Sequence, residues 1–330
     1  MYEAFYGLKQ NPFNVTPDPQ FLYLGEKHRE ALAHLVYGVK QKKGFIVITG
    51  EVGTGKTTLI RCLLERFDGS NGTKAAFLFN PKLSATDFLQ FILKDLGLTV
   101  QGKTKGDSLH TLNEYLLSTY EKGEKVILIV DEAQGLHPHV LEEIRLLSNL
   151  ETSKSKLLQI ILVGQPELDR TLSSREFRQI RQRINMRYSL QPLSEKETKE
   201  YIEKRLQIAG AQDPIFTSRA IQEVYRQTRG IPRLINILCD NSLLNGFASE
   251  RMRIDRKLVG DAARDLKLGG KFQIGWVWIL LGALITGGIL SYVLVQETGK
   301  LGTLFGGFLH HLQSLKDFIW NAMKPFHRLL

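Results

Sequence analysis

A glycine-rich loop between a strand-like run and a helix-like run restricts the fold of this chain more than any other feature. The segment GEVGTGKTT, residues 50–58, follows the apolar run FIVIT and precedes LIRCLLERF. It fits the pattern of a glycine, four residues and then Gly-Lys-Thr, in which backbone N–H groups at a helix start turn toward a phosphate. We expect Lys56 to reach the β- and γ-phosphates of a nucleotide and Thr57 to bind Mg²⁺.

Three more apolar runs predict an α/β fold around this loop. AAFLF (75–79), VILIV (126–130) and LLQIILVG (157–164) are separated by segments with helical character. Runs that are apolar throughout are typical of parallel strands covered by helices on both faces. We therefore expect a doubly wound α/β core.

The pattern changes at about Gln191. PLSEKETKEYIEKRLQIAG, SRAIQEVYRQTRG and IPRLINILCDNSLLNGFASE are typical of helices and carry little strand signal. Glycine and proline residues mark the joints between them. The sequence predicts that a small all-helical domain follows the core.

Two acidic residues follow the VILIV run, at the point where a buried strand would end. We expect Asp131 to hold the hydration shell of Mg²⁺ and Glu132 to orient and deprotonate an attacking water. Gln165, just beyond LLQIILVG, is placed to put an amide between this water and the γ-phosphate. The alternative is that the two acids cap the next helix and that Gln165 only forms a turn.

The composition predicts a folded, basic protein. With 330 residues, 43% of them hydrophobic, the chain can form one large or two moderate globular domains. Its formal net charge of +10 suits nucleic acid, nucleotide phosphates or an anionic membrane face, and charge alone does not choose among them. Cys62 and Cys239 lack metal-like spacing, which favours free thiols in a reducing compartment.

Residues 274–295 form the most apolar stretch and contain no charged residue. About 20 helical residues cross the ~30 Å hydrocarbon core of a bilayer, so this stretch predicts a transmembrane helix. Basic residues precede it closely, whereas Lys300 alone follows within a similar distance, which predicts a cytoplasmic N-terminal part and a tail outside. The preceding basic residues are Arg256, Lys257, Arg264, Lys267 and Lys271.

Together these segments resemble the AAA+ ATPases, and more narrowly the general secretion pathway protein A family of membrane-anchored ATPases. The resemblance covers about residues 1–268. It implies a P-loop AAA+ core with a parallel sheet, a helical lid, ATP and Mg²⁺ at the loop, and a homo-oligomeric ring. The segments that carry it are MYEAFYGLKQNPFNVTPDPQFLYLGEKHREALAHLVYGV, GEVGTGKTT, VDEAQ, LVGQPEL, FRQIRQRI and GIPRLINILCD.

The resemblance also implies roles for single residues. Gln165 matches the first sensor, and Arg233, in GIPRLIN, matches the second sensor, a cation that the lid brings to the γ-phosphate. Leu24, His28 and Arg29 resemble the region that packs on adenine, and simple helix-to-sheet packing is the alternative. The nucleotide-binding residues expected in all are Gly50, Glu51, Val52, Gly53, Thr54, Gly55, Lys56, Thr57, Thr58 and Arg233.

An arginine finger is the last implied element. In AAA+ rings this residue enters the site of the neighbouring subunit, where it stabilises the developing phosphoryl charge. In FRQIRQRI the candidates are Arg178, Arg181 and Arg183, with Arg181 preferred. The alternative is that two of these arginines only solvate a helix face.

The tail differs from many members of the family, which continue into a large periplasmic region with a peptidoglycan-binding module. Residues 296–330 are too short for that module, so we expect none in this chain. Their apolar residues recur at three- and four-residue steps, which predicts one amphipathic helix that lies on the outer leaflet, pairs with a partner helix or self-associates. These residues are Phe305, Phe308, Leu312, Leu315, Ile319, Ala322 and Phe326.

The expected organisation is an N-terminal segment (1–43), an AAA+ P-loop core (44–190), a helical lid (191–268), a linker with the transmembrane helix (269–296) and a periplasmic tail (297–330). The leading hypothesis is a single-pass ATPase of the bacterial inner membrane that serves a type II-like secretion apparatus or exopolysaccharide export. One alternative is a DNA-binding regulator resembling transposition ATPases, against which the predicted span argues. Another is an ATP-binding scaffold with negligible turnover.

Overall fold

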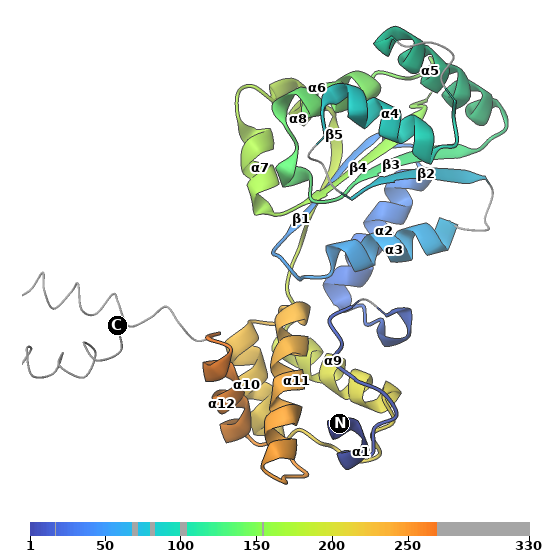
Figure 1. The fold of residues 1–330 in the computed structure, drawn as a ribbon. Coiled ribbons are helices and arrows are strands. Elements are labelled where there is room, and N and C mark those ends of the chain that lie inside the picture. The colour runs from blue at the N-terminus through green and yellow to red at the C-terminus, as the bar shows by residue number, and fades with distance from the viewer. Residues whose placement is uncertain (17, 68–71, 80–82, 100–103, 154, 269–330) are drawn as a thin grey trace, which may run out of the picture. The chain divides into compact units, whose positions relative to one another are not determined.

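A five-stranded parallel sheet with the order β2-β3-β4-β1-β5 forms the core of the protein. It is seen in a computed structural model that describes residues 1–16, 18–67, 72–79, 83–99, 104–153 and 155–268 (Figure 1). The α/β prediction is confirmed. The strands are β1 (Phe45–Gly50), β2 (Thr73–Leu78), β3 (Lys125–Val130), β4 (Leu158–Gly164) and β5 (Ile184–Leu190).

Helices cover both faces of this sheet, because alternate side chains of each central strand point to opposite sides. In β3, Ile127 and Ile129 pack on one helix layer, and Leu128 and Val130 pack on the other. The first layer contains α2 (Glu26–Lys40) and α3 (Lys56–Phe67). The second contains α4 (Ala85–Asp95), α5 (Lys105–Glu121), α6 (Pro138–Leu147), α7 (Pro166–Ser173) and α8 (Arg178–Arg183), with the short 3₁₀ turn η2 (Ala133–Gly135).

Strand β5 is the one element of the sheet that the sequence did not predict. It lies at an edge, where it pairs with β1. Its residues alternate between partly buried and exposed along INMRYSL, up to the buried Leu190. A half-exposed edge strand needs no continuous apolar run, so the criterion that found the other four strands misses it.

Within the described residues, four helices follow the sheet and confirm the predicted helical lid. They are α9 (Glu195–Ile208), α10 (Ser218–Thr228), α11 (Pro232–Ala248) and α12 (Arg256–Asp265). Their apolar faces enclose a core of their own, separate from the two layers on the sheet. The fully buried Ile202, Val224, Leu238 and Val259 represent the four helices in it.

The start of the chain packs into the lid. We call residues 1–16 and 18–24 the N-terminal strap; it includes α1 (Tyr2–Phe5) and the 3₁₀ turn η1 (Pro19–Phe21). Phe13, 1% exposed, lies in the lid core with its ring against Phe216. The Lys9 N–H donates to the Ala209 carbonyl at 2.7 Å. The segment expected over residues 1–43 therefore divides into a strap on the lid and α2 on the sheet.

No helix in the described part of the chain is long and apolar enough to cross a bilayer. The span predicted at residues 274–295 and the amphipathic tail predicted at 297–330 lie outside the described residues.

Candidate functional site

The glycine loop joins β1 to α3 at the carboxyl edge of the sheet. Gly53 has φ +81° and Gly55 has φ +97°, a region that side-chain-bearing residues rarely adopt. A Cβ atom on Gly53 would also approach the Cβ of Arg233 to 2.7 Å. The two glycines are therefore needed both for the shape of the loop and for its close contact with the lid.

Lys56 is the first residue of α3, and its side chain turns back into the glycine loop. Its side chain is 5% exposed, and its ammonium donates to the carbonyl oxygens of Gly50 at 2.8 Å and Glu51 at 3.0 Å. Burial lowers the pKa of Lys56, while the negative charges of Glu132, Asp131 and Glu51 oppose this shift. The two carbonyl oxygens satisfy N–H donors of the ammonium but carry no net charge to balance it. A phosphate would supply the balancing negative charge, so this buried ammonium suits a phosphate.

The Thr57 hydroxyl and the Asp131 carboxylate, the two groups expected to bind a divalent cation, lie together beside the glycine loop. The Thr57 hydroxyl donates to Oδ2 of Asp131 at 2.7 Å, and Oδ1 of Asp131 accepts the Glu132 N–H at 2.9 Å. In the described residues no group of three or more His, Cys, Asp or Glu side chains could hold a metal ion. A hydroxyl and one carboxylate, completed by phosphate oxygens and water, are typical of Mg²⁺ at nucleotides, so the residues fit this ion.

Glu132 is exposed and held by two amides. Its carboxylate accepts from Nε2 of Gln134 at 2.5 Å and from Nε2 of Gln165 at 3.1 Å. Gln165 also donates its backbone N–H to Gln134 at 2.9 Å, which joins the ends of β3 and β4. Glu132 adopts a left-handed backbone conformation with φ +53°, and strain of this kind gathers at functional sites. The structure thus brings the two residues expected to handle water side by side.

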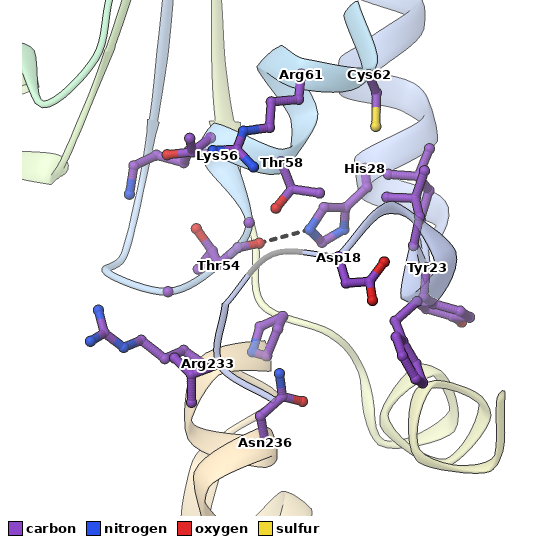
Figure 2. A pocket seen from close by; sticks show the side chains of 18 of the residues that line it. Asp18, Tyr23, His28, Thr54, Lys56, Thr58, Arg61, Cys62, Arg233 and Asn236 are labelled. Carbon is purple, nitrogen blue, oxygen red and sulfur yellow. Dashed lines mark hydrogen bonds between the residues drawn. The ribbon is translucent and has the colours of Figure 1, made fainter. Parts of the chain in front are cut away.

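A cavity of about 460 Å³ opens beside the loop, between the core, the strap and the lid (Figure 2). Buried His28 lines it, and its Nε2 donates to the Thr54 carbonyl at 2.8 Å. Burial lowers the pKa of His28, which favours the neutral ring. The Thr54 carbonyl can only accept, so it calls for the proton on Nε2. Leu24 also lines the cavity, whereas Arg29 is exposed and donates to the Leu24 carbonyl instead of facing it.

The lid meets the loop through the start of α11. The backbone N–H of Arg233 donates to the Gly53 carbonyl at 3.3 Å, and the Arg233 side chain lines the cavity, as does Asn236 one turn later. Figure 2 shows both side chains extending from α11 toward the loop. The residue expected to sense the γ-phosphate is therefore fixed at its backbone to the loop itself.

Arg205 of α9 is a site residue that the sequence analysis missed. It is 6% exposed and lines the cavity, with its guanidinium over the rings of Phe21 at 4.7 Å and Tyr201 at 5.4 Å. It donates to the strap carbonyls of Pro12 and Asn14 and, at 3.0 Å, to the Tyr201 hydroxyl. In the described part of the chain no carboxylate forms an ion pair with it.

A hydrogen-bond relay continues from Arg205 into α11. The Tyr201 hydroxyl donates to Oδ1 of Asn236 at 2.8 Å, and Nδ2 of Asn236 donates to the Asn14 carbonyl at 3.4 Å. Strap, α9 and α11 are thereby connected beside the cavity. Arg205 could have been found from the sequence, because it occupies the apolar stripe of α9 that includes Tyr201, Ile202 and Leu206.

The three finger candidates lie elsewhere. Arg178 and Arg181 are exposed on α8, Arg183 is partly exposed at its end, and the described structure does not bring any of them to the cavity. Nη1 of Arg181 donates to the Ser173 carbonyl at 3.0 Å. Their assignment to a neighbouring subunit's site remains a prediction.

Comparison with known proteins agrees with this geometry. Residues 39–172 match the family described as AAA domain. The chain is an AAA domain protein. It is 42% identical over 313 residues to the general secretion pathway protein A of Aeromonas hydrophila. That alignment covers 93% of this chain and 55% of the relative, so the chain spans little more than half of that protein's length.

Solved structures share the fold of this AAA domain and its lid. The ORC2 protein of Aeropyrum pernix, in ADPNP and ADP complexes, has a TM-score of 0.57 at 19% identity, with 78% of this chain and 71% of that one covered. Cdc6p of Pyrobaculum aerophilum has a TM-score of 0.57 at 17% identity, with 76% and 71% covered. At these identities the likeness supports the fold alone.

The Arg205 relay predicts a loss of nucleotide affinity when the guanidinium is removed. Arg205→Met keeps an unbranched apolar stem but leaves the Pro12 and Asn14 carbonyls without this donor, so the strap should lose its place at the cavity. We expect the Kd for an ATP analogue to rise about tenfold, since a hydrogen bond to a charged group contributes about 1.5–3 kcal/mol. Equilibrium titration measures it.

Lys199→Met on the exposed side of the same helix is the matched control and should leave the Kd within about twofold. Equal Kd values for Arg205→Met and the parent chain would show that the relay does not support the cavity.

Proposed function

We propose that this protein is an ATPase, anchored in the bacterial inner membrane, that drives assembly or operation of an envelope secretion or exopolysaccharide export system. The observation that carries the chemical part is the cluster at the carboxyl edge of the sheet. There Lys56, the Thr57–Asp131 pair at 2.7 Å and the Glu132–Gln165 pair at 3.1 Å come from three different strand ends.

In the proposed mechanism, Lys56 and the loop N–H groups bind the β- and γ-phosphates of ATP. Thr57, with Asp131 behind it, would hold Mg²⁺, which would supply charge neutralisation for the phosphates. Glu132 orients a water in line with the γ-phosphorus and takes its proton, and the amide of Gln165 fixes the Glu132 carboxylate. Arg233 approaches the γ-phosphate from the lid, so that loss of this phosphate changes what the lid contacts.

The oligomeric part of the proposal rests on the finger arginines. Because Arg178, Arg181 and Arg183 lie away from their own cavity, a finger from this segment would serve the site of an adjacent copy in a ring. The link to export rests on the likeness to general secretion pathway protein A over 93% of this chain. The membrane anchor rests on the predicted span at 274–295, with the AAA domain in the cytoplasm and the tail in the periplasm.

Glu132→Gln tests the chemical step. The amide keeps the size of the side chain but cannot take a proton, so ATP should still bind while phosphate release falls by about 10² to 10⁴-fold. Glu167→Gln, at an exposed position on α7, removes the same charge and should keep parental turnover. Full turnover in Glu132→Gln would remove the proposed base.

Complementation tests the finger. Arg181→Ala and Lys56→Ala chains should each be inactive alone, yet co-produced chains should regain ATPase activity. An interface then forms in which an intact loop from one chain meets an intact finger from the other. Arg175→Ala, an exposed neighbour, should stay active by itself. If mixing restores nothing while both variants still co-purify with parent chains, Arg181 does not act in trans.

Partner capture tests the export role. The Glu132→Gln chain, cross-linked in native membranes with ATP, should enrich inner-membrane export or envelope-assembly proteins relative to Lys56→Ala. Uncleaved ATP should keep the Glu132→Gln chain in the state that binds partners. The Lys56→Ala chain, which should not bind ATP, should not reach that state. Recovery of DNA and recombination proteins without any envelope component would favour a DNA-binding regulator instead.

A further inference from the structure

A basic hollow of about 500 Å³ lies on the lid and shares no lining residue with the nucleotide cavity. Its lining residues come from α10 and α12, which pack side by side in Figure 1. We call its cationic residues the basic lid face: Arg226 on α10 and Arg256, Lys257 and Arg264 on α12. Two acidic residues, Glu223 and Asp261, also line it. The mechanism proposed above uses none of these side chains.

One buried carboxylate organises the centre of this face. The Glu223 side chain is 4% exposed and accepts from Nε of Arg226 at 2.9 Å and Nε of Arg256 at 3.2 Å. Hydrogen bonds from Arg226, from the Gln227 amide and from Arg256 lower the pKa of Glu223 to about 2, so it stays charged. One negative charge faces two positive ones, and the two guanidinium side chains are 63% and 68% exposed.

The rest of the face adds to this positive excess. Arg264 pairs with Asp261 and is 80% exposed. Within the described residues no carboxylate forms an ion pair with Lys257. Four cations thus stand against two carboxylates around one open hollow, with N–H donors free to reach an outside anion. Arginine and lysine at a surface of this kind suit phosphate groups.

The position along the chain indicates which phosphates these are. Helix α12 ends at Asp265, and the predicted transmembrane run begins at Ile274. An extended chain advances at most about 3.6 Å per residue, so a bilayer entered at Ile274 would lie within about 30 Å of the end of α12. Anionic headgroups at the cytoplasmic surface attract basic segments at such short range.

We infer that the basic lid face binds the phosphate headgroups of anionic lipids in the bilayer that anchors the chain. The inference rests on the proposed membrane anchor. DNA offers similar phosphates, but an anchored chain would always have lipid phosphates within this tether length, whereas DNA would have to be recruited. The lid would then be the part of the AAA domain that is held at the membrane.

The test places a reporter thiol in the hollow. Gly260 lines it, and a Cβ added there meets no atom within 4 Å. The full chain carrying Gly260→Cys and Cys62→Ala, with Cys239 buried, is inserted in nanodiscs of phosphatidylcholine alone or with about 30% phosphatidylglycerol. The readout is the ratio of the PEG-maleimide labelling rates in the two kinds of disc. A substitution that changes the intrinsic reactivity of the thiol changes both rates, so this effect cancels in the ratio.

We expect labelling to be about fivefold slower in the anionic discs, and about 0.5 M salt to remove the difference. Lys257→Gln with Arg264→Gln removes two charges of the basic lid face and should bring the ratio close to that in salt. These two residues are chosen because both are exposed and neither pairs with Glu223. Lys196→Gln with Lys199→Gln on α9, which also removes two exposed charges, should keep the protection.

Four results would overturn the inference. Equal labelling in both discs would do so, as would protection that Lys257→Gln with Arg264→Gln does not reduce. Binding of duplex DNA that falls in this double variant, without any lipid effect, would assign the face to nucleic acid. ATPase activity is measured in the same discs, so that failure of the lipid inference can be distinguished from failure of the proposed function. A chain that cannot be inserted in discs would overturn the anchor and the inference together.

Discussion

The parallel direction of the strands is the constraint on which the site depends. Parallel strands end at one edge of a sheet, so β1, β3 and β4 deliver the glycine loop, the acidic pair and Gln165 to the same place. Strand β4 lies between β1 and β3 and separates the loop from the acids by one strand. That spacing lets the Thr57 hydroxyl reach Asp131 at 2.7 Å.

The lid completes the cavity, and it does so together with the start of the chain. Arg205 is a buried cation whose partners are carbonyl oxygens, a hydroxyl and two aromatic rings. Removing a buried charge from water is unfavourable unless hydrogen bonds replace the lost hydration, and the strap carbonyls supply them. Strap and lid are therefore one structural piece, and the Arg233 N–H ties this piece to Gly53.

The sequence predicted the parts of this structure that depend on local pattern. The loop shape follows from Gly53 and Gly55, and β1, β3 and β4 follow from unbroken apolar runs that two helix layers require. Strand β5 was missed because the residues of an edge strand can alternate between partly buried and exposed, and they then form no continuous apolar run. The strap was not predicted, because its contacts join residues far apart in the sequence. Phe13 packs on Phe216, and Arg205 donates to the Pro12 and Asn14 carbonyls, and no local pattern indicates either pairing. The left-handed backbone of Glu132 was not predicted either, because it depends on the surrounding structure and not on the residue type.

The central claim is that ATP binds at this edge of the sheet with Mg²⁺ between Thr57 and Asp131. Equilibrium binding of a slowly hydrolysed ATP analogue to the full chain, measured with and without Mg²⁺, tests it most directly. The account predicts saturable binding of about one nucleotide per chain that Mg²⁺ tightens, and no Mg²⁺ effect in Thr57→Ala, which lacks the hydroxyl ligand. Absence of saturable binding, or a Mg²⁺ effect that Thr57→Ala retains in full, would contradict it.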